Sequence, residues 1–229
     1  MTIRNSENAL VVFAKYPVPG EVKTRLSKQV GRDAATAFYA CSIRYLLNRL
    51  QQKSGIFDII IAVGQESRLH DFRAEFTGGD GYVAQDQTPD LGRRMRTTIK
   101  DCLHDGYKKV GVIGTDSPNL PIDAIVEGFE RLDTVDLVVA PAEDGGYYHI
   151  AVGADIPALF ENIEWSTETV FEKTMQIADS LELRVHVGPV FYDIDDVSGL
   201  RKLWRDVPGF FTASGLLDSN PELKNALLL

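Results

Sequence analysis

The stretch ALVVFAKYPVPGEVKTRLS, residues Ala9–Ser27, decides the fold prediction because a buried strand passes there abruptly into a basic loop. Its first part, Ala9–Lys15, is a short continuous apolar run, typical of a strand that is covered on both faces of a sheet. Pro17 and Pro19 stiffen the loop that follows, and Gly20 permits an unusual backbone angle. Since ligands of open α/β sheets bind at the carboxyl ends of the strands, this loop is the first candidate site.

The charge of the chain is spread unevenly. The 229 residues carry a formal net charge of −9, yet residues 1–28 hold five basic and two acidic side chains. A positive loop on an acidic body suits a small anionic ligand, and it argues against a general nucleic-acid binder. A solvated surface loop remains the alternative reading of the same charges.

The composition is that of an ordinary globular protein, with 44% hydrophobic and 25% charged residues. The opening MTIRNSENAL lacks the apolar core of a signal peptide, and no apolar run reaches the roughly 18 residues of a membrane span. Cys41 and Cys102 have no CxxC or histidine partner, so we expect buried apolar side chains there. The expected location is the cytoplasm.

Predicted strands and helices alternate along the chain. The strands are expected at residues 9–15, 57–63, 82–84, 110–115, 136–140, 147–152 and 183–187. The helices are expected at residues 32–52, 66–76, 91–104, 122–132, 167–181 and 197–204, with Pro121 at a first helical position and Ser166 as a cap. This alternation predicts one α/β domain over residues 1–229, with a mostly parallel sheet covered on both faces. The tail Phe210–Leu229 is apolar enough to dock on the body or on a neighbouring subunit of a homo-oligomer.

Acidic residues follow two of the predicted strands or strand ends. Asp116 stands at the tip of a central strand, and Mg²⁺ prefers one or two carboxylates together with phosphate oxygens. Asp193 and Asp195 fall on one face of the chain, where two like charges are costly without a cation. The alternatives are that Asp116 caps its own turn and that Asp195 or Asp196 caps the next helix.

Three further places carry possible ligand groups. In the basic loop, Lys15, Lys23 and Arg25 could converge on phosphates, although neither GxxxxGK[ST] nor GxGxxG is present. The run Asp90–Met95 could line a nucleobase pocket or simply carry surface charges. Asp144 could bind sugar-like hydroxyls or act as a base, but an Asp-Gly pair is also the commonest hairpin signal.

The order of these motifs is more specific than any one of them. Between residues 13 and 196 the chain contains, in order, FAKYPVPGEVKTRLS, DLGRRM, GTDSPNL, DGGYYHIAVG, WSTETV and DIDD. This set resembles the bacterial glycosyltransferase-like family of GT-A (nucleotide-diphospho-sugar transferase) fold that is often found beside radical-SAM proteins. It is more distantly similar to the nucleotidyltransferases that make molybdopterin dinucleotide and to phospholactate guanylyltransferase.

The resemblance implies a three-layer Rossmann-like sheet that binds a nucleotide, with Mg²⁺ or Mn²⁺ on its diphosphate. Lys15, Gly20, Lys23 and Arg25 would then form the phosphate-binding loop.

By the same resemblance, Gly92 and Arg94 would lie by the nucleobase. Asp116 and Asp195 would hold the metal, and Asp144 would face the acceptor or the sugar. The chain departs from the family pattern at Pro89, where a glycine is usual, and in the residues that follow Asp195.

These features predict a metal-dependent transferase that acts on a nucleotide-activated sugar and a small-molecule acceptor. A nucleotidyltransferase that uses an NTP and releases pyrophosphate is the first alternative. A nucleotide-binding protein without turnover is the second.

Overall fold

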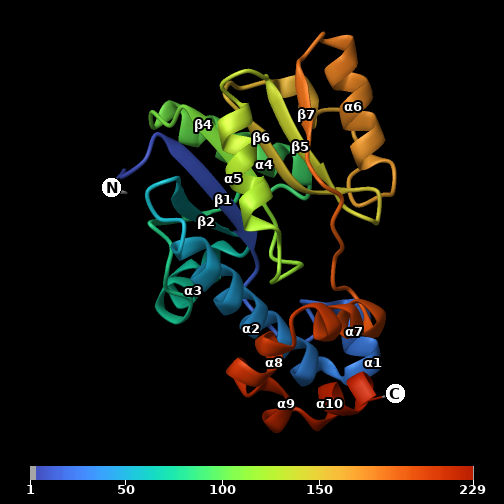
Figure 1. The fold of residues 1–229 in the computed structure, drawn as a ribbon. Coiled ribbons are helices and arrows are strands. Elements are labelled where there is room, and N and C mark those ends of the chain that lie inside the picture. The colour runs from blue at the N-terminus through green and yellow to red at the C-terminus, as the bar shows by residue number, and fades with distance from the viewer. Residues whose placement is uncertain (1–3, 229) are drawn as a thin grey trace.

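The computed structural model describes residues 4–228, and a sheet covered by helices on both faces dominates it (Figure 1). Within this range the sheet has seven strands, in the order β3-β2-β1-β4-β6-β5-β7. The strands are β1 (Asn8–Ala14), β2 (Asp58–Val63), β3 (Gly81–Ala84), β4 (Lys109–Ile113), β5 (Leu137–Pro141), β6 (Tyr147–Val152) and β7 (Val185–Val187). Strand β6 runs antiparallel to β4 and β5, and the other pairs are parallel. The carboxyl ends of six strands therefore meet at one edge.

Helices alternate with the strands as expected. They are α1 (Thr24–Val30), α2 (Arg32–Gln51), α3 (Leu69–Glu75), α4 (Leu91–His104), α5 (Ile122–Arg131), α6 (Val170–Ser180), α7 (Val197–Asp206), α8 (Pro208–Ser214), α9 (Leu216–Ser219) and α10 (Pro221–Leu228), with 3-10 turns η1 (Glu66–Arg68) and η2 (Pro157–Phe160). Helices α2, α3 and α5 cover one face of the sheet, and α4 and α6 cover the other. The prediction of an α/β fold with a mostly parallel sheet is confirmed.

The alternating side chains of β1 show why the sheet is covered twice. Leu10 and Val12 pack into the core beneath α2, α3 and α5, whereas Ala9 and Val11 pack into the core beneath α4. All four side chains are buried. Because both faces of the strand are buried, its sequence is a continuous apolar run and does not alternate with polar residues.

A helical lobe, made of α1, the start of α2 and α7–α10, lies beyond the carboxyl edge of the sheet (Figure 1). Its core joins Leu26 and Phe38 from the N-terminal part to Phe210 and Phe211 from the tail. The tail, as far as residue 228, thus docks on its own chain. No helix in residues 4–228 is long and apolar enough to cross a membrane.

Several helix starts differ from the prediction. Helix α1 occupies part of the segment expected as loop, and Lys23 precedes it in a left-handed conformation with φ 45°. Helix α6 begins three residues late because Ser166 has φ 65°, and the Thr167 hydroxyl donates to the Glu164 carbonyl in a turn at 2.8 Å. Pro121 is the residue before α5 and not its first residue.

Candidate functional site

The ends of β1 and β4 lie side by side at the carboxyl edge, because Val12 pairs with Ile113. Tyr39 of α2 ties these ends together. Its hydroxyl accepts a hydrogen bond from the Lys15 backbone N–H at 3.1 Å and shares one with the Thr115 hydroxyl at 2.7 Å. Burial raises the pKa of Tyr39, so the phenol stays neutral. The spacing between the basic loop and the tip of β4 is thereby fixed.

The chain after β7 returns to the same edge. Phe191 forms a bridge beside Ala142 at the end of β5. The Ser117 hydroxyl then donates to the Tyr192 carbonyl at 2.6 Å, and the Ile194 N–H donates to the Asp116 carbonyl at 3.4 Å. These contacts bring Asp195 close to Asp116, and the predicted metal-binding role of the two residues stays a prediction.

Lys23 stands between the two carboxylates. Its ammonium donates to Asp116 Oδ1 at 2.7 Å, to the Asp116 carbonyl at 3.0 Å and to Asp195 Oδ1 at 3.4 Å. The Lys23 side chain is only 2% exposed. Arg25 approaches the other oxygen of Asp195 at 3.3 Å, from an exposed position. In this structure Lys23 therefore contacts carboxylates, and its predicted contact with phosphate stays a prediction.

The electrostatics of the site follow from this arrangement. The charge of Lys23 lowers the pKa of Asp116. Burial works to lower the pKa of Lys23, but the charges of Asp116 and Asp195 outweigh it and raise that pKa. Lys23 and Asp116 thus favour each other's charged form.

Asp193 and Asp196 have different surroundings from Asp195. Burial, helped by the charges of Asp116 and Asp144, raises the pKa of Asp193 to about 7. Asp196 caps α7 by accepting a hydrogen bond from the Gly199 N–H at 3.0 Å. The helix-capping role that the sequence left open thus belongs to Asp196, and Asp195 is left for the site.

Asp144 lies in the turn between β5 and β6. Its Oδ1 accepts a hydrogen bond from the Gly146 N–H at 2.9 Å, so the hairpin reading of this motif is correct. Gly145 has φ +88°, and a Cβ there would collide with the Glu168 backbone. The Asp144 side chain remains exposed near Asp193, and its predicted role toward an acceptor stays a prediction.

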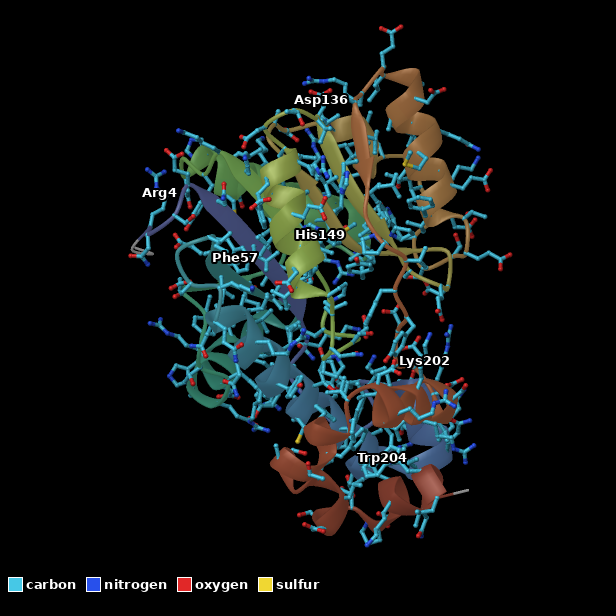
Figure 2. All side chains as sticks on the ribbon, viewed as in Figure 1. Arg4, Phe57, Asp136, His149, Lys202 and Trp204 are labelled. Carbon is cyan, nitrogen blue, oxygen red and sulfur yellow. The ribbon has the colours of Figure 1, made fainter. Side chains whose placement is uncertain are left out.

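A salt bridge joins this turn to the helical lobe. Lys202 of α7 lies 2.8 Å from the Glu143 carboxylate and 3.9 Å from the centre of the Tyr192 ring. Figure 2 shows Lys202 on the side of the lobe that faces the sheet. The Tyr192 hydroxyl in turn donates to Asp206 at 2.7 Å. Sequence reasoning did not find Lys202, because nothing near it in the sequence resembles a ligand-binding motif.

The basic loop has the geometry that its prolines and glycine indicated. The Glu21 N–H donates to the Val18 carbonyl at 3.0 Å, and Gly20 has φ +88°, as expected for a Pro-Gly turn. Lys15 follows β1 directly and is exposed. In residues 4–228 no carboxylate lies within 4 Å of its ammonium, so Lys15 is available to an anionic ligand.

The predicted base-binding residues lie at the start of α4. A Cβ on Gly92 would sit 2.5 Å from Trp165 Nε1, so tight packing already requires a glycine there. Arg94 donates to Gln85 Oε1 at 3.1 Å, and Gln85 donates to the Ala62 carbonyl at 2.8 Å. Gln85 was missed in the sequence, although a polar residue directly after a strand is a usable signal.

The carboxylates fit a divalent cation that is shared with a ligand. Within residues 4–228 no cluster of three or more His, Cys, Asp or Glu side chains could enclose a metal. The side chains of Asp116 and Asp195 are 60% and 42% exposed, so their oxygens are open to solvent. Two carboxylates that leave the other positions to phosphate and water match the preference of Mg²⁺.

Comparison with known proteins places the chain in a family. The sequence profile described as "Uncharacterized protein conserved in bacteria (DUF2064)" matches residues 46–167, and the chain belongs to this family. A crystal structure of a provisionally assigned nucleotide-diphospho-sugar transferase from Desulfovibrio desulfuricans G20 has 31% identity and a TM-score of 0.86. The alignment covers 97% of this chain and 98% of that one. A search of curated proteins found no match.

More distant structures share the fold. The inositol-1-phosphate CTP transferase from T. maritima has a TM-score of 0.53 at 14% identity, with 91% and 98% of the two chains covered. The manganese complex of Rv0371C from Mycobacterium tuberculosis H37Rv has a TM-score of 0.51 at 14% identity, with 87% and 98% covered. They confirm the predicted fold, and the relative from Desulfovibrio desulfuricans G20 supports the class of nucleotide-related transferases.

Proposed function

We propose that the protein is a metal-dependent transferase that acts on a nucleotide-activated sugar. One observation carries the proposal: Asp116 and Asp195, from distant parts of the chain, meet around Lys23 at the carboxyl edge of the sheet. Exposed basic side chains flank this pair, so the site offers ligands for a cation and for an anion together. A metal–diphosphate satisfies both demands.

Asp116 and Asp195 would hold Mg²⁺ or Mn²⁺. When bound, the cation would neutralise charge on the diphosphate leaving group. Lys15 and Arg25 would bind the phosphates from the solvent side, since both are exposed beside the carboxylates. Preorganised positive groups of this kind stabilise charge that develops in the transition state. The manganese complex of a protein with the same fold supports the choice of metal.

The nucleobase and the acceptor would occupy opposite sides of this centre. Gln85 lies directly after β3 and holds Arg94, in the first turn of α4, whose guanidinium would read a base edge. Asp144 lies beyond β4, near Asp193, and would bind or deprotonate an acceptor hydroxyl.

Isothermal titration calorimetry with a panel of nucleotide sugars, with and without Mn²⁺, tests this function. We expect binding of at least one nucleotide sugar that depends on Mn²⁺. Asp116→Asn should abolish the Mn²⁺ dependence, whereas Asp218→Asn, which changes an exposed carboxylate of α9, should leave it unchanged. No binding across the panel, or an Asp116→Asn variant that behaves like the wild type, would reject the site.

Nucleotidyl transfer is the second candidate, favoured by the fold shared with the CTP transferase from T. maritima. The same centre would then bind an NTP and release pyrophosphate. A pyrophosphate-release assay over the four NTPs with small phosphorylated or hydroxylated acceptors separates the two reactions. Binding without turnover in both screens would instead favour a nucleotide-binding protein that lacks catalysis.

A further inference from the structure

The Lys23 ammonium has no hydrogen-bond donor left for a ligand. Its three contacts, to both side-chain and backbone oxygens of Asp116 and to Asp195, use all three N–H groups. The side chain is 2% exposed, so solvent cannot replace these contacts. A left-handed backbone, with φ 45°, directs this lysine inward while its neighbour Arg25 stays exposed. In the free protein Lys23 therefore binds the carboxylates and has no donor left for phosphate.

Both carboxylates that contact Lys23 are already paired with basic side chains before any ligand arrives. Asp116 and Asp195 supply two negative charges, and Lys23 and Arg25 supply two positive charges within 3.4 Å of them. Lys15 adds a further positive charge, which contributes to the lowered pKa of Asp116. A free divalent cation would thus meet repulsion from the lysines and arginine, whereas a cation carried on a diphosphate brings its own negative charge.

We propose that Lys23 is the built-in counter-cation of Asp116 and Asp195, so that the metal enters only together with an anionic substrate. The proposal rests on the proposed function for the identity of that substrate. It gives Lys23 a positioning role: the ammonium keeps the two carboxylates adjacent in the free protein. It also makes Lys23 a competitor of the free metal.

Titration with Mn²⁺ alone, followed by electron paramagnetic resonance, tests this role without any nucleotide. Removing one positive charge at contact distance from the metal ligands should strengthen binding about tenfold or more, even at a water-like dielectric. We therefore expect Lys23→Met to bind free Mn²⁺ at least about tenfold more tightly than the wild type. Lys100→Met, which removes an exposed charge of α4, should bind like the wild type. Adding Asp116→Asn to Lys23→Met should remove the gain.

A second variant tests the same proposal if Lys23→Met does not fold. Arg25 is 76% exposed, so Arg25→Gln should fold and should tighten free Mn²⁺ binding severalfold. Equal or weaker Mn²⁺ binding by Lys23→Met, or by Arg25→Gln if the first variant is unfolded, overturns the proposal. Tight binding of Mn²⁺ alone by the wild type also overturns it. The Mn²⁺ titration contains no nucleotide, so it tests only the role of Lys23. Failure of the proposed function would be seen in the calorimetry with nucleotide sugars.

Discussion

His149 provides a sharp test of how the core of this fold responds to pH. It lies on β6 behind α5 (Figure 2), is 1% exposed, and packs against two glycines. An added Cβ would lie 2.9 Å from its Nε2 at Gly111 and 3.0 Å from its Cε1 at Gly128. Nε2 has no hydrogen-bond partner among the described residues. We predict that replacing His149 with leucine removes an acid-sensitive contribution to stability.

The magnitude follows from burial. Burial lowers the pKa of His149 from 6.5 to about 3, because no nearby group compensates the imidazolium charge. Between these pH values the unfolded chain binds a proton that the native protein does not bind. Stability therefore falls as pH falls below 6.5, by about 1.4 kcal/mol per pH unit. Between pH 7 and pH 5 the expected loss is roughly 2 kcal/mol.

Asp193 contributes a pH dependence of opposite sign, so the His149→Leu variant must be compared with the wild type. The pKa of Asp193 is raised to about 7, so the native protein binds its proton first and gains stability as pH falls from 7 toward 4. The wild-type curve alone would therefore hide part of the histidine effect. The difference in unfolding free energy between His149→Leu and the wild type cancels the Asp193 contribution.

Urea unfolding at pH 7 and pH 5, followed by tryptophan fluorescence, gives this difference. We expect it to shift by roughly 2 kcal/mol in favour of His149→Leu at pH 5. Ile150, a fully buried neighbour on β6 without a titratable group, supplies the control, and Ile150→Val should show the same difference at both pH values. If His149→Leu also shows a constant difference, the imidazole is not held neutral by burial and the reasoning fails.

Three further substitutions test packing and position. Arg184 lowers the pKa of Asp136 to about 2 through paired hydrogen bonds, so Asp136→Asn should lower the melting temperature at pH 7 but not at pH 2. Gly92→Ala would place a Cβ against the Phe160 carbonyl of η2, and we expect a loss of about 1–3 kcal/mol in chemical unfolding. Tyr39→Phe removes the acceptor of the Lys15 N–H, whereas the Thr115 hydroxyl keeps its bond to the Phe13 carbonyl, and we expect a cost of about 1–3 kcal/mol. Calorimetry should show weaker nucleotide binding for the Tyr39 variant, because β1 and β4 lose their shared hydroxyl.

The sheet could be predicted from the sequence because its strands have no polar face. β1 and β2 lie within one residue of the expected ranges, since a continuous apolar run marks its own ends. Helix α1 could not be predicted in this way. Only Leu26 and Val30 of its seven residues are buried, and they pack on a lobe built from the far end of the chain. The two apolar side chains of α1 are buried only because α7–α10 pack against them.

The candidate site shows the same division. Asp116 and Asp195 could be selected because each stands where a strand or its extension ends, and that position is a local property of the sequence. The contacts of Lys23 with these carboxylates could not be predicted. The inward direction of Lys23 depends on a left-handed backbone and on a segment that arrives only through contacts with Ser117 and Asp116.

The predicted phosphate contact of Lys23 and its observed carboxylate contacts are compatible if they belong to successive states. All three N–H groups of the ammonium are engaged in the free protein, so phosphate can take one only if a carboxylate gives it up. Giving it up would leave a carboxylate charge uncompensated, which is costly unless another cation takes the place of the ammonium. Under the proposed order of binding, the metal arrives on the diphosphate and supplies that cation at the same moment. The lysine would then be released toward the phosphate only when both parts of the substrate complex are present.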